Sequence, residues 1–326
     1  METRITVKIP SPKVWPWHLL TLAILLILAA SLWAATNKID YTWRWNRVPQ
    51  YFFYNAKTLK SSPFDGSVVS IKKDGGLSTI ELKSDSGKVK TFKVETDSLN
   101  VTAGETLFEG DRIGSTSEWK AGPLVQGMLM TLWLSAAASF FGMLIGLITG
   151  LCRISKNPTL RGLASLYIEL IRGTPLLVQI FIFYFFLGTV LDIGRVVSGI
   201  SALAIFAGAY VAEIIRAGIQ SISKGQSEAA RSLGMTSFQT MVYIVLPQAF
   251  KRVLPPLAGQ FISLIKDSSL VSVIAITDLT KSGREVITST FATFEIWFTV
   301  ALLYLLLTSV LSQLIAWVER RLAVSD

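Results

Sequence analysis

Histidine, cysteine and charged side chains are scarce in this sequence of 326 residues. There is one histidine, His18, and one cysteine, Cys152. A single cysteine excludes an internal disulfide framework, and a single histidine leaves little for a zinc site built by the protein. Charged residues make up 16% and apolar residues 51% of the chain, whereas about 25% of a typical soluble protein is charged. This composition excludes a single soluble globular enzyme and a disordered chain.

Six stretches without charged residues have about the length of a membrane span, which takes roughly 20 residues. They cover 14–37, 121–152, 173–191, 196–212, a split stretch at 253–265 and 268–277, and 296–318. The first also has features of a cleaved signal peptide. Its apolar run is long for such a peptide, and Pro10 and Pro12 in the lead-in are atypical, so we favour an uncleaved anchor.

Basic residues are distributed unevenly over the short loops between these stretches, and such a bias sets the orientation of membrane proteins. One face would hold Arg195, Lys281 and Arg284. The other would hold many more: Arg4, Lys8, Lys13, Arg153, Lys156, Arg161, Lys224, Arg231, Lys251, Arg252, Arg320 and Arg321. The sequence therefore predicts that both termini lie in the cytoplasm.

Residues 37–122 form a polar insertion between the first and second spans. Val, Ile and Thr are frequent at 67–72, 78–83 and 88–95, and glycine turns separate these runs, which predicts short strands. The pattern resembles the barrel-sandwich of biotinyl or lipoyl carrier domains and periplasmic adaptors. Because the insertion has no histidine for zinc, we interpret it as a non-catalytic interaction or spacer module. Three parts are thus expected: 1–36 with the first span, an extracytoplasmic β-rich domain at 37–122, and a five-helix core at 123–326.

The loop at 224–250 has the signals of a helix, a break and a second helix. Ser227 is a possible cap of the first helix, and Gly234 suits the left-handed residue that ends it. Thr236 and Gln239 have the spacing of a capping box for the second helix, and Pro247 marks a disruption. The pattern predicts a rigid protrusion from the membrane face.

The same loop resembles the EAA loop of permease subunits of bacterial ABC importers. The matching positions are Glu228, Ala229, Ala230, Gly234, Ile244, Leu246 and Pro247. The polar amino-acid uptake branch is further matched at 167–179, 209–219, 264–274, 290–296 and 319–321, so the resemblance covers roughly 123–323. It implies that residues around 226–240 couple the pore to a separate ATPase subunit. It also implies two such ATPase copies, a second permease copy or paralogue, and a periplasmic substrate-binding protein.

Polar residues inside the predicted spans are candidates for a substrate pathway, because such groups are costly in a bilayer. Lys266 and Asp267 interrupt the fifth span, with Ser268 and Ser269 beside them. An amino acid carries a carboxylate and an ammonium, which a lysine and an aspartate complement. The alternative is a structural ion pair between helices. Gln179 and Glu213 are further candidates, although local pairing of Glu213 with Arg216 at i,i+3 explains the glutamate as well.

Gly142, Gly146 and Gly150 are small residues four apart that permit close helix packing, either within the subunit or between two permeases. The chain has no phosphate-binding loop, so ATP and magnesium would belong to the partner ATPase, and no cofactor or nucleic acid is expected on this chain. The sequence thus predicts an all-α integral membrane protein with an inserted β-rich domain, acting as the permease of an ATP-driven importer of polar amino acids in the bacterial inner membrane. The alternatives are an ion-driven secondary transporter and a membrane-anchored adaptor that binds a periplasmic partner.

Overall fold

The computed structural model describes residues 15–39 and 41–323. The chain divides into two compact units between Trp45 and Asn46. The first unit contains one long helix, α1 (Trp15–Lys38). Its described side chains are mostly apolar and nearly all are exposed, which is the pattern of a helix surrounded by lipid. The predicted N-terminal span is therefore present as a helix, whereas the basic residues before it lie outside the described residues.

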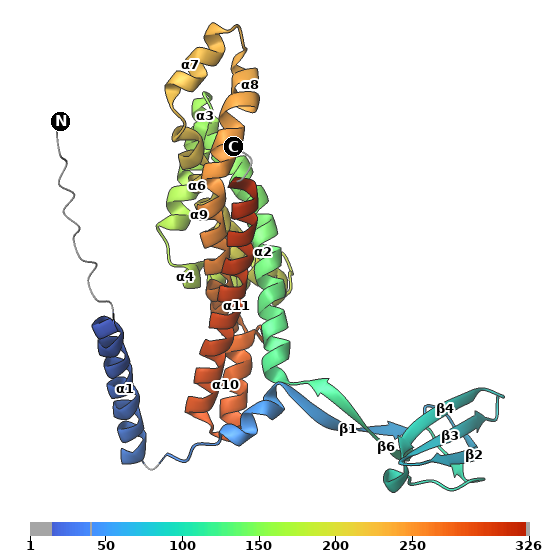
Figure 1. The fold of residues 1–326 in the computed structure, drawn as a ribbon. Helices are drawn as coiled ribbons and strands as arrows, with labels where there is room; N and C mark the ends of the chain where they lie inside the picture. The colour runs from blue at the N-terminus through green and yellow to red at the C-terminus, as the bar shows by residue number, and fades with distance from the viewer. Residues whose placement is uncertain (1–14, 40, 324–326) are drawn as a thin grey trace, which may run out of the picture. The chain divides into compact units, whose positions relative to one another are not determined.

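The second unit begins with short strands that follow the 3₁₀ turn η1 (Trp45–Tyr51). Four antiparallel strands form a sheet in the order β4-β3-β2-β5, and β1 pairs with β6 in a separate ribbon (Figure 1). The predicted strands at 67–72, 78–83 and 88–95 are confirmed. The bounds are β1 (Phe53–Ser61), β2 (Gly66–Asp74), β3 (Leu77–Ser84), β4 (Val89–Glu95), β5 (Thr106–Leu107) and β6 (Arg112–Ala121), with a 3₁₀ turn η2 (Thr96–Ser98).

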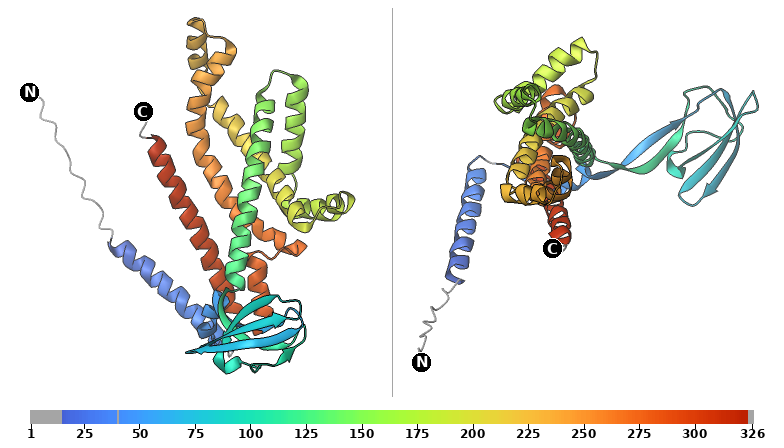
Figure 2. Two further views of the ribbon diagram at one scale, coloured as in Figure 1. Left: turned by 90° about the vertical axis from the view of Figure 1, so that its right-hand side faces the viewer. Right: turned by 90° about the horizontal axis from the view of Figure 1, so that it is seen from above.

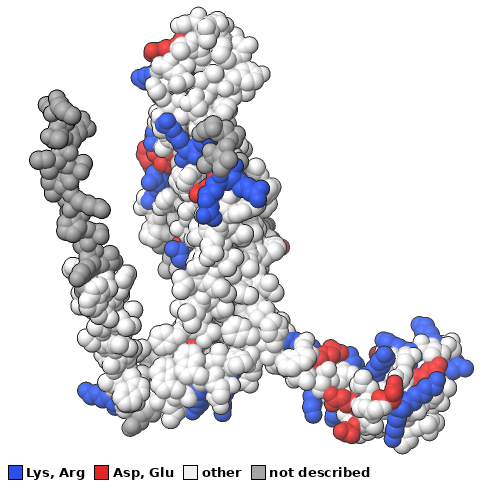
Figure 3. Space-filling model, in the orientation of Figure 1, with Lys and Arg blue, Asp and Glu red and all other residues white. Residues whose placement is uncertain are grey.

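The sheet and the start of β6 enclose a small apolar core. Ile80, Leu82, Val94 and Ile113 are fully buried in it, because alternate residues along each strand point to the same face. The outer surface of this part carries charged side chains of both signs, basic and acidic (Figure 3). The four-stranded sheet and the start of β6 therefore share one core, and the likeness to a barrel-sandwich stays a prediction.

Helices make up the rest of the second unit. Among the described residues, five helices of the chain are long and apolar enough to cross a membrane, and a bent helix pair makes a sixth candidate. The helices at 123–323 are α2 (Pro123–Ile154), α3 (Pro158–Arg172), α4 (Leu176–Phe181), a π turn η3 (Ile182–Leu187), α5 (Gly188–Val190), α6 (Arg195–Gln220), α7 (Lys224–Ser232), α8 (Ser237–Thr240), a π turn η4 (Met241–Val245), α9 (Leu246–Asp267), a 3₁₀ turn η5 (Ser268–Ile274), α10 (Leu279–Thr290) and α11 (Thr293–Ala323).

The predicted span at 173–191 contains the second limb of a bent helix pair, and the bend lies at the start of that span. The pair consists of α3 and the segment Leu176–Val190, and the two limbs meet at an angle of 103°. Figure 2 shows the corresponding turn in the green and yellow-green part of the ribbon. Pro175 lacks an N–H to continue α3, and the helix breaks at Gly173–Thr174 before it.

The centre of the helical part is the packing of α2 on α6. A Cβ on Gly142 would lie 2.9 Å from Cβ of Ala207, and one on Gly146 would lie 2.4 Å from Cγ1 of Val211. Both distances are shorter than real side chains allow, so only glycine permits this approach. The small-residue repeat thus packs within this chain, which decides between the two possibilities that the sequence left open.

Candidate functional site

The loop predicted to couple the pore to an ATPase is a helical hairpin made by α7 and α8 (Figure 1). Helix α7 begins at Lys224 after the cap residue Ser223. The predicted cap Ser227 is therefore wrong, because it lies inside the helix. Of the three residues that begin the resemblance, Glu228 and Ala229 are exposed, whereas Ala230 is buried.

Gly234 ends α7 in the left-handed conformation that the sequence predicted. Its φ is +86°, where a side chain would be strained. The N–H of Gly234 donates to the carbonyl of Arg231 at 3.0 Å, and the N–H of Met235 donates to the carbonyl of Ala230 at 3.2 Å. This pair of bonds is the Schellman motif. It fixes the direction in which the chain leaves α7.

The predicted capping box at Thr236 and Gln239 is present. The N–H of Gln239 donates to Oγ1 of Thr236 at 3.2 Å, and the N–H of Thr236 donates to Oε1 of Gln239 at 2.8 Å. The helix then widens into η4, which contains the half-buried Ile244, and α9 begins with Leu246 and Pro247. Proline cannot donate to the preceding turn, so the predicted disruption falls at this π turn.

Large apolar side chains are exposed on the hairpin. Leu233 is 85% exposed and Phe238 is 76% exposed. Tyr243 and Leu246 extend this surface along η4 and the start of α9. Exposed apolar side chains gathered on one projecting element are typical of a protein–protein contact. We call Leu233, Phe238 and Tyr243 the hairpin contact surface.

Lys266 and Asp267 lie where α9 ends and η5 begins. Lys266 is exposed and Asp267 is half-buried, and within the described part of the chain neither forms an ion pair. Ser268 is buried, and its Oγ donates to the carbonyl of Ile265 at 2.7 Å. Ser269 is half-buried. The helix thus tightens at this point, and among the described residues the two charges have no ion-pair partner.

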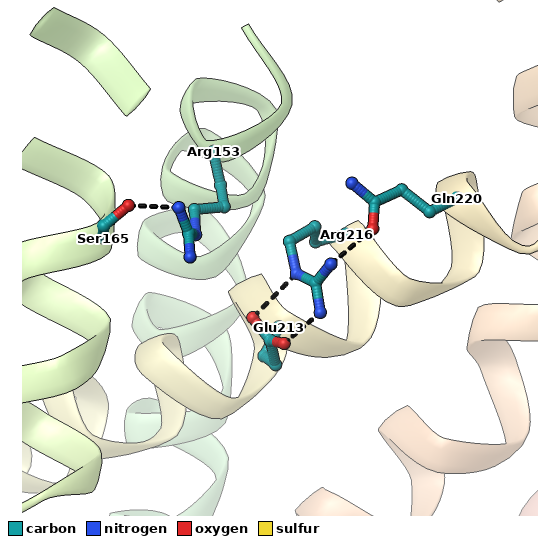
Figure 4. A network of polar contacts seen from close by, with 5 residues as sticks. All are labelled: Arg153, Ser165, Glu213, Arg216 and Gln220. Carbon is teal, nitrogen blue, oxygen red and sulfur yellow. Dashed lines mark hydrogen bonds and ion pairs between the residues drawn. The ribbon is translucent and has the colours of Figure 1, made fainter. Parts of the chain in front are cut away.

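The other two candidates have partners within the chain. Nε2 of Gln179 donates to the carbonyl of Ile171 at 2.7 Å and to Oγ1 of Thr174 at 2.8 Å, so this buried amide ties together the two limbs of the bent span. Glu213 accepts from Nε of Arg216 at 3.0 Å and forms an ion pair with it (Figure 4). The local i,i+3 pair of the sequence interpretation is therefore present.

A buried polar network around Asp278 was missed by the sequence analysis. Its carboxyl accepts from the N–H groups of Thr280 and Lys281, each at 3.0 Å, and from the hydroxyl of Tyr304 at 3.2 Å. The N–H of Leu279 donates to Oγ1 of Thr131 on α2 at 3.0 Å. Burial raises the pKa of the Asp278 carboxyl, although these hydrogen bonds oppose the rise. An aspartate directly before a helix is a cap signal that can be found in the sequence.

Residues 142–324 match the family model for the binding-protein-dependent transport system inner membrane component. The chain belongs to this family. The match contains the hairpin, the bent segment after α3 and the Lys266–Asp267 segment, and it begins after the strands. The members of this family are permeases, the membrane subunits of transport systems.

Similar proteins lead to the same family. The glutamine transport system permease protein GlnP of Escherichia coli is 40% identical over 210 residues, which are 63% of this chain and 96% of GlnP. The probable glutamine ABC transporter permease protein GlnM of Bacillus subtilis is 43% identical over 202 residues, or 62% of this chain and 94% of GlnM. The solved structure of an amino acid ABC transporter with histidines has 44% identity and a TM-score of 0.58, and the match covers 61% of this chain and 94% of that one.

A more distant structure supports the fold alone. An inward-facing conformation of the MetNI methionine ABC transporter matches with a TM-score of 0.55 at 22% identity. The shared part again covers 61% of this permease. The fold expected from the sequence, a helical core of the ABC importer type, is thereby confirmed for the C-terminal two thirds.

Proposed function

We propose that this permease imports polar amino acids through the bacterial inner membrane, driven by ATP that a separate subunit hydrolyses. The observation that carries the proposal is the capped hairpin of α7 and α8, which displays Leu233 and Phe238 on a membrane protein of this family. Relatives named for glutamine transport support the substrate class. ATP and magnesium are held by the partner ATPase and not by this chain.

The hairpin is a rigid element that can transmit movement of the ATPase to the transmembrane helices. The Schellman motif at Gly234 and the capping box at Thr236 satisfy the backbone groups at both sides of the turn. A turn held by these bonds moves as one body, and the π turn η4 connects it directly to α9. An ATPase that grips Leu233 and Phe238 would therefore transmit its closure to α9, which ends at Asp267.

The complete transporter contains two ATPase subunits, a second permease copy or paralogue, and a substrate-binding protein outside the membrane. Both termini are cytoplasmic, and the β-rich domain at 37–122 is periplasmic. In alternating access, ATP and the loaded binding protein stabilise the outward-open pore relative to the inward-open pore. Each must bind the two states with different affinity, since otherwise it could not shift their populations.

The substrate contacts Asp267 and Lys266. These two charges lie at the end of α9 without an intrachain ion pair in the described residues, so an amino acid can offer its ammonium to one and its carboxylate to the other. Ser269 adds a half-buried hydroxyl to this segment. Gln179 and Glu213 act indirectly, because the amide nitrogen of Gln179 and the carboxylate of Glu213 already have partners within the chain.

The test is purification of the tagged permease in mild detergent, with identification of the subunits that co-elute. We expect an ABC-type ATPase, and we expect its loss when Leu233 and Phe238 are both changed to serine. A permease that drives uptake from an ion gradient with no associated ATPase would instead be a secondary transporter. A complex with a periplasmic protein alone, held by residues 37–122, would identify an adaptor.

A further inference from the structure

A basic cavity lies beside α7, on the side of the chain where α2 ends and α3 begins. Its volume is about 670 Å³. It is lined by the ends of α2 and α6, by the start of α3, by α7 and by η4. The charged residues in its lining are Arg153, Arg161, Lys224, Arg231 and Glu228. Four cations thus face one carboxylate.

Glu228 is the carboxylate that shares the cavity lining with these four cations, and Arg153 also acts electrostatically on Glu213. Within the described residues, Arg153, Arg161, Lys224 and Arg231 form no ion pair. Like charges around one cavity repel each other, and the repulsion is strongest where water is partly excluded. An anion that enters the cavity would reduce this repulsion.

Arg153 provides a hydrogen-bond donor at the cavity. Its guanidinium donates to Oγ of Ser165 (Figure 4). Its Nε is buried and has no hydrogen-bond partner in the described part of the chain. A buried N–H without an acceptor costs free energy that a bound acceptor would recover. A planar guanidinium binds two oxygens of one phosphate or carboxylate group.

The walls of the cavity indicate which anion enters. Ile222 and Val245 are buried apolar residues in its lining. A volume of about 670 Å³ is larger than one phosphate group needs. A basic rim over an apolar floor is complementary to a phosphate that carries an apolar tail.

We propose that this cavity binds a phosphate-bearing anion, supplied by an anionic phospholipid headgroup or by free phosphate. The anion bridges Arg153 and Arg161, at the turn between α2 and α3, to Lys224 and Arg231 on α7. It thereby holds the hairpin against the transmembrane helices. The importance of this contact for transport rests on the proposed function, in which α7 passes on the movement of the ATPase.

The experiment uses the full chain, purified with the subunits that bind it and placed in nanodiscs of phosphatidylcholine with or without phosphatidylglycerol. Native mass spectrometry counts retained phosphatidylglycerol per permease, and amide exchange follows α7. Inorganic phosphate is added in the second arm. The variants are Arg153→Gln with Arg161→Gln, and separately Lys224→Gln with Arg231→Gln, which leaves α2 and α3 unchanged. Arg320→Gln removes an exposed cation at the end of α11 as the matched control.

Retention of phosphatidylglycerol that falls about tenfold or more in both double variants, but not in Arg320→Gln, supports the lipid as the source. No preference for the lipid, with protection of α7 by phosphate in the wild type alone, supports free phosphate. Full retention and protection in both double variants, or an equal loss in Arg320→Gln, would overturn the proposal. Lipid is counted per permease, so the lipid result can be interpreted whether or not an ATPase co-purifies. Absence of an ATPase would contradict the proposed function alone.

Discussion

The backbone N–H of Met235 reaches back over Gly234 and donates to the carbonyl of Ala230 at 3.2 Å. Ala230 is the third residue of the Glu228–Ala229–Ala230 match to the EAA loop. The bond therefore joins this match to the turn that follows α7. It forms only when Gly234 has a positive φ, which is +86° here. The shape of the hairpin thus depends on the backbone conformation of one residue, so the coupling role can be tested by mutation of Gly234.

Changing Gly234 to valine should uncouple ATP hydrolysis from uptake. A Cβ at this position meets nothing within 4 Å, so the effect comes from the left-handed backbone, which costs a side-chain residue about 1–2 kcal/mol. Uptake and ATP hydrolysis are measured together in proteoliposomes. Gly234→Asn is the control, because asparagine tolerates this conformation. Full coupled transport by the valine variant would argue against the role of the turn.

Gly146→Ala should destabilise the packing of α2 on α6. The new Cβ would lie 2.4 Å from Cγ1 of Val211, and such overpacking costs about 1–3 kcal/mol. Thermal unfolding in detergent measures the loss. Val211→Ala in the same chain should restore part of it, and Gly162→Ala, where nothing lies within 4 Å, should not destabilise. Equal unfolding temperatures for Gly146→Ala and the wild type would contradict the close approach.

Replacing Leu233 and Phe238 by serine should weaken ATPase binding. Truncation of a central apolar contact costs about 2 kcal/mol or more, so each change should raise the dissociation constant at least about tenfold. Binding is measured by titration of the ATPase onto the permease in nanodiscs. Phe108→Ser removes a side chain that is 65% exposed among the β-strand loops and should have no effect. If the Phe108 variant loses affinity to the same extent, the hairpin is not the contact.

Asp267→Asn should lower uptake without dissociating the complex. The change removes the charge that would bind the substrate ammonium and keeps the size of the side chain. Initial uptake rates are compared at matched permease density. Asp192→Asn, an exposed loop acid outside the predicted pathway, should transport normally. Wild-type uptake by the Asp267 variant would remove this residue from the pathway.

The Asp278 carboxyl should destabilise the fold progressively as the pH rises. Its folded pKa is raised by burial, so the folded state binds the proton more tightly than the unfolded state, whose pKa is about 3.9. Stability should fall as the pH rises from the unfolded to the folded pKa and stay level above it. Asp278→Asn keeps a cap residue without this titration. The unfolding temperature of the wild type minus that of the variant should therefore decrease with pH, and an increase would contradict the assignment.

The local structure of the hairpin could be predicted from the sequence, because its determinants are close in the chain. Gly234, Thr236 and Gln239 each act through backbone groups at most five residues away. The start of α7 was placed wrongly at Ser227 because Gly225 weakens the helix signal there. The helix begins earlier, at Lys224, with Ser223 as the cap residue.

Longer-range features needed the structure. Apolar composition marks 173–191 as a span but carries no information on direction, and the bend depends on Gln179 reaching back to Ile171 and Thr174. The spacing of Gly146 in the repeat shows that a close neighbour exists, whereas the neighbour, Val211, is set by tertiary packing. Four cations from three separate helices likewise meet at one cavity only in the folded chain.

The most direct test of the account is uptake by purified components. The permease, its co-eluting ATPase and its substrate-binding protein are reconstituted in liposomes, and accumulation of labelled glutamine is measured with and without internal ATP. The account predicts accumulation that requires ATP hydrolysis and the binding protein, and that is lost with Gly234→Val. Accumulation driven by an imposed ion gradient in the absence of ATP would contradict it.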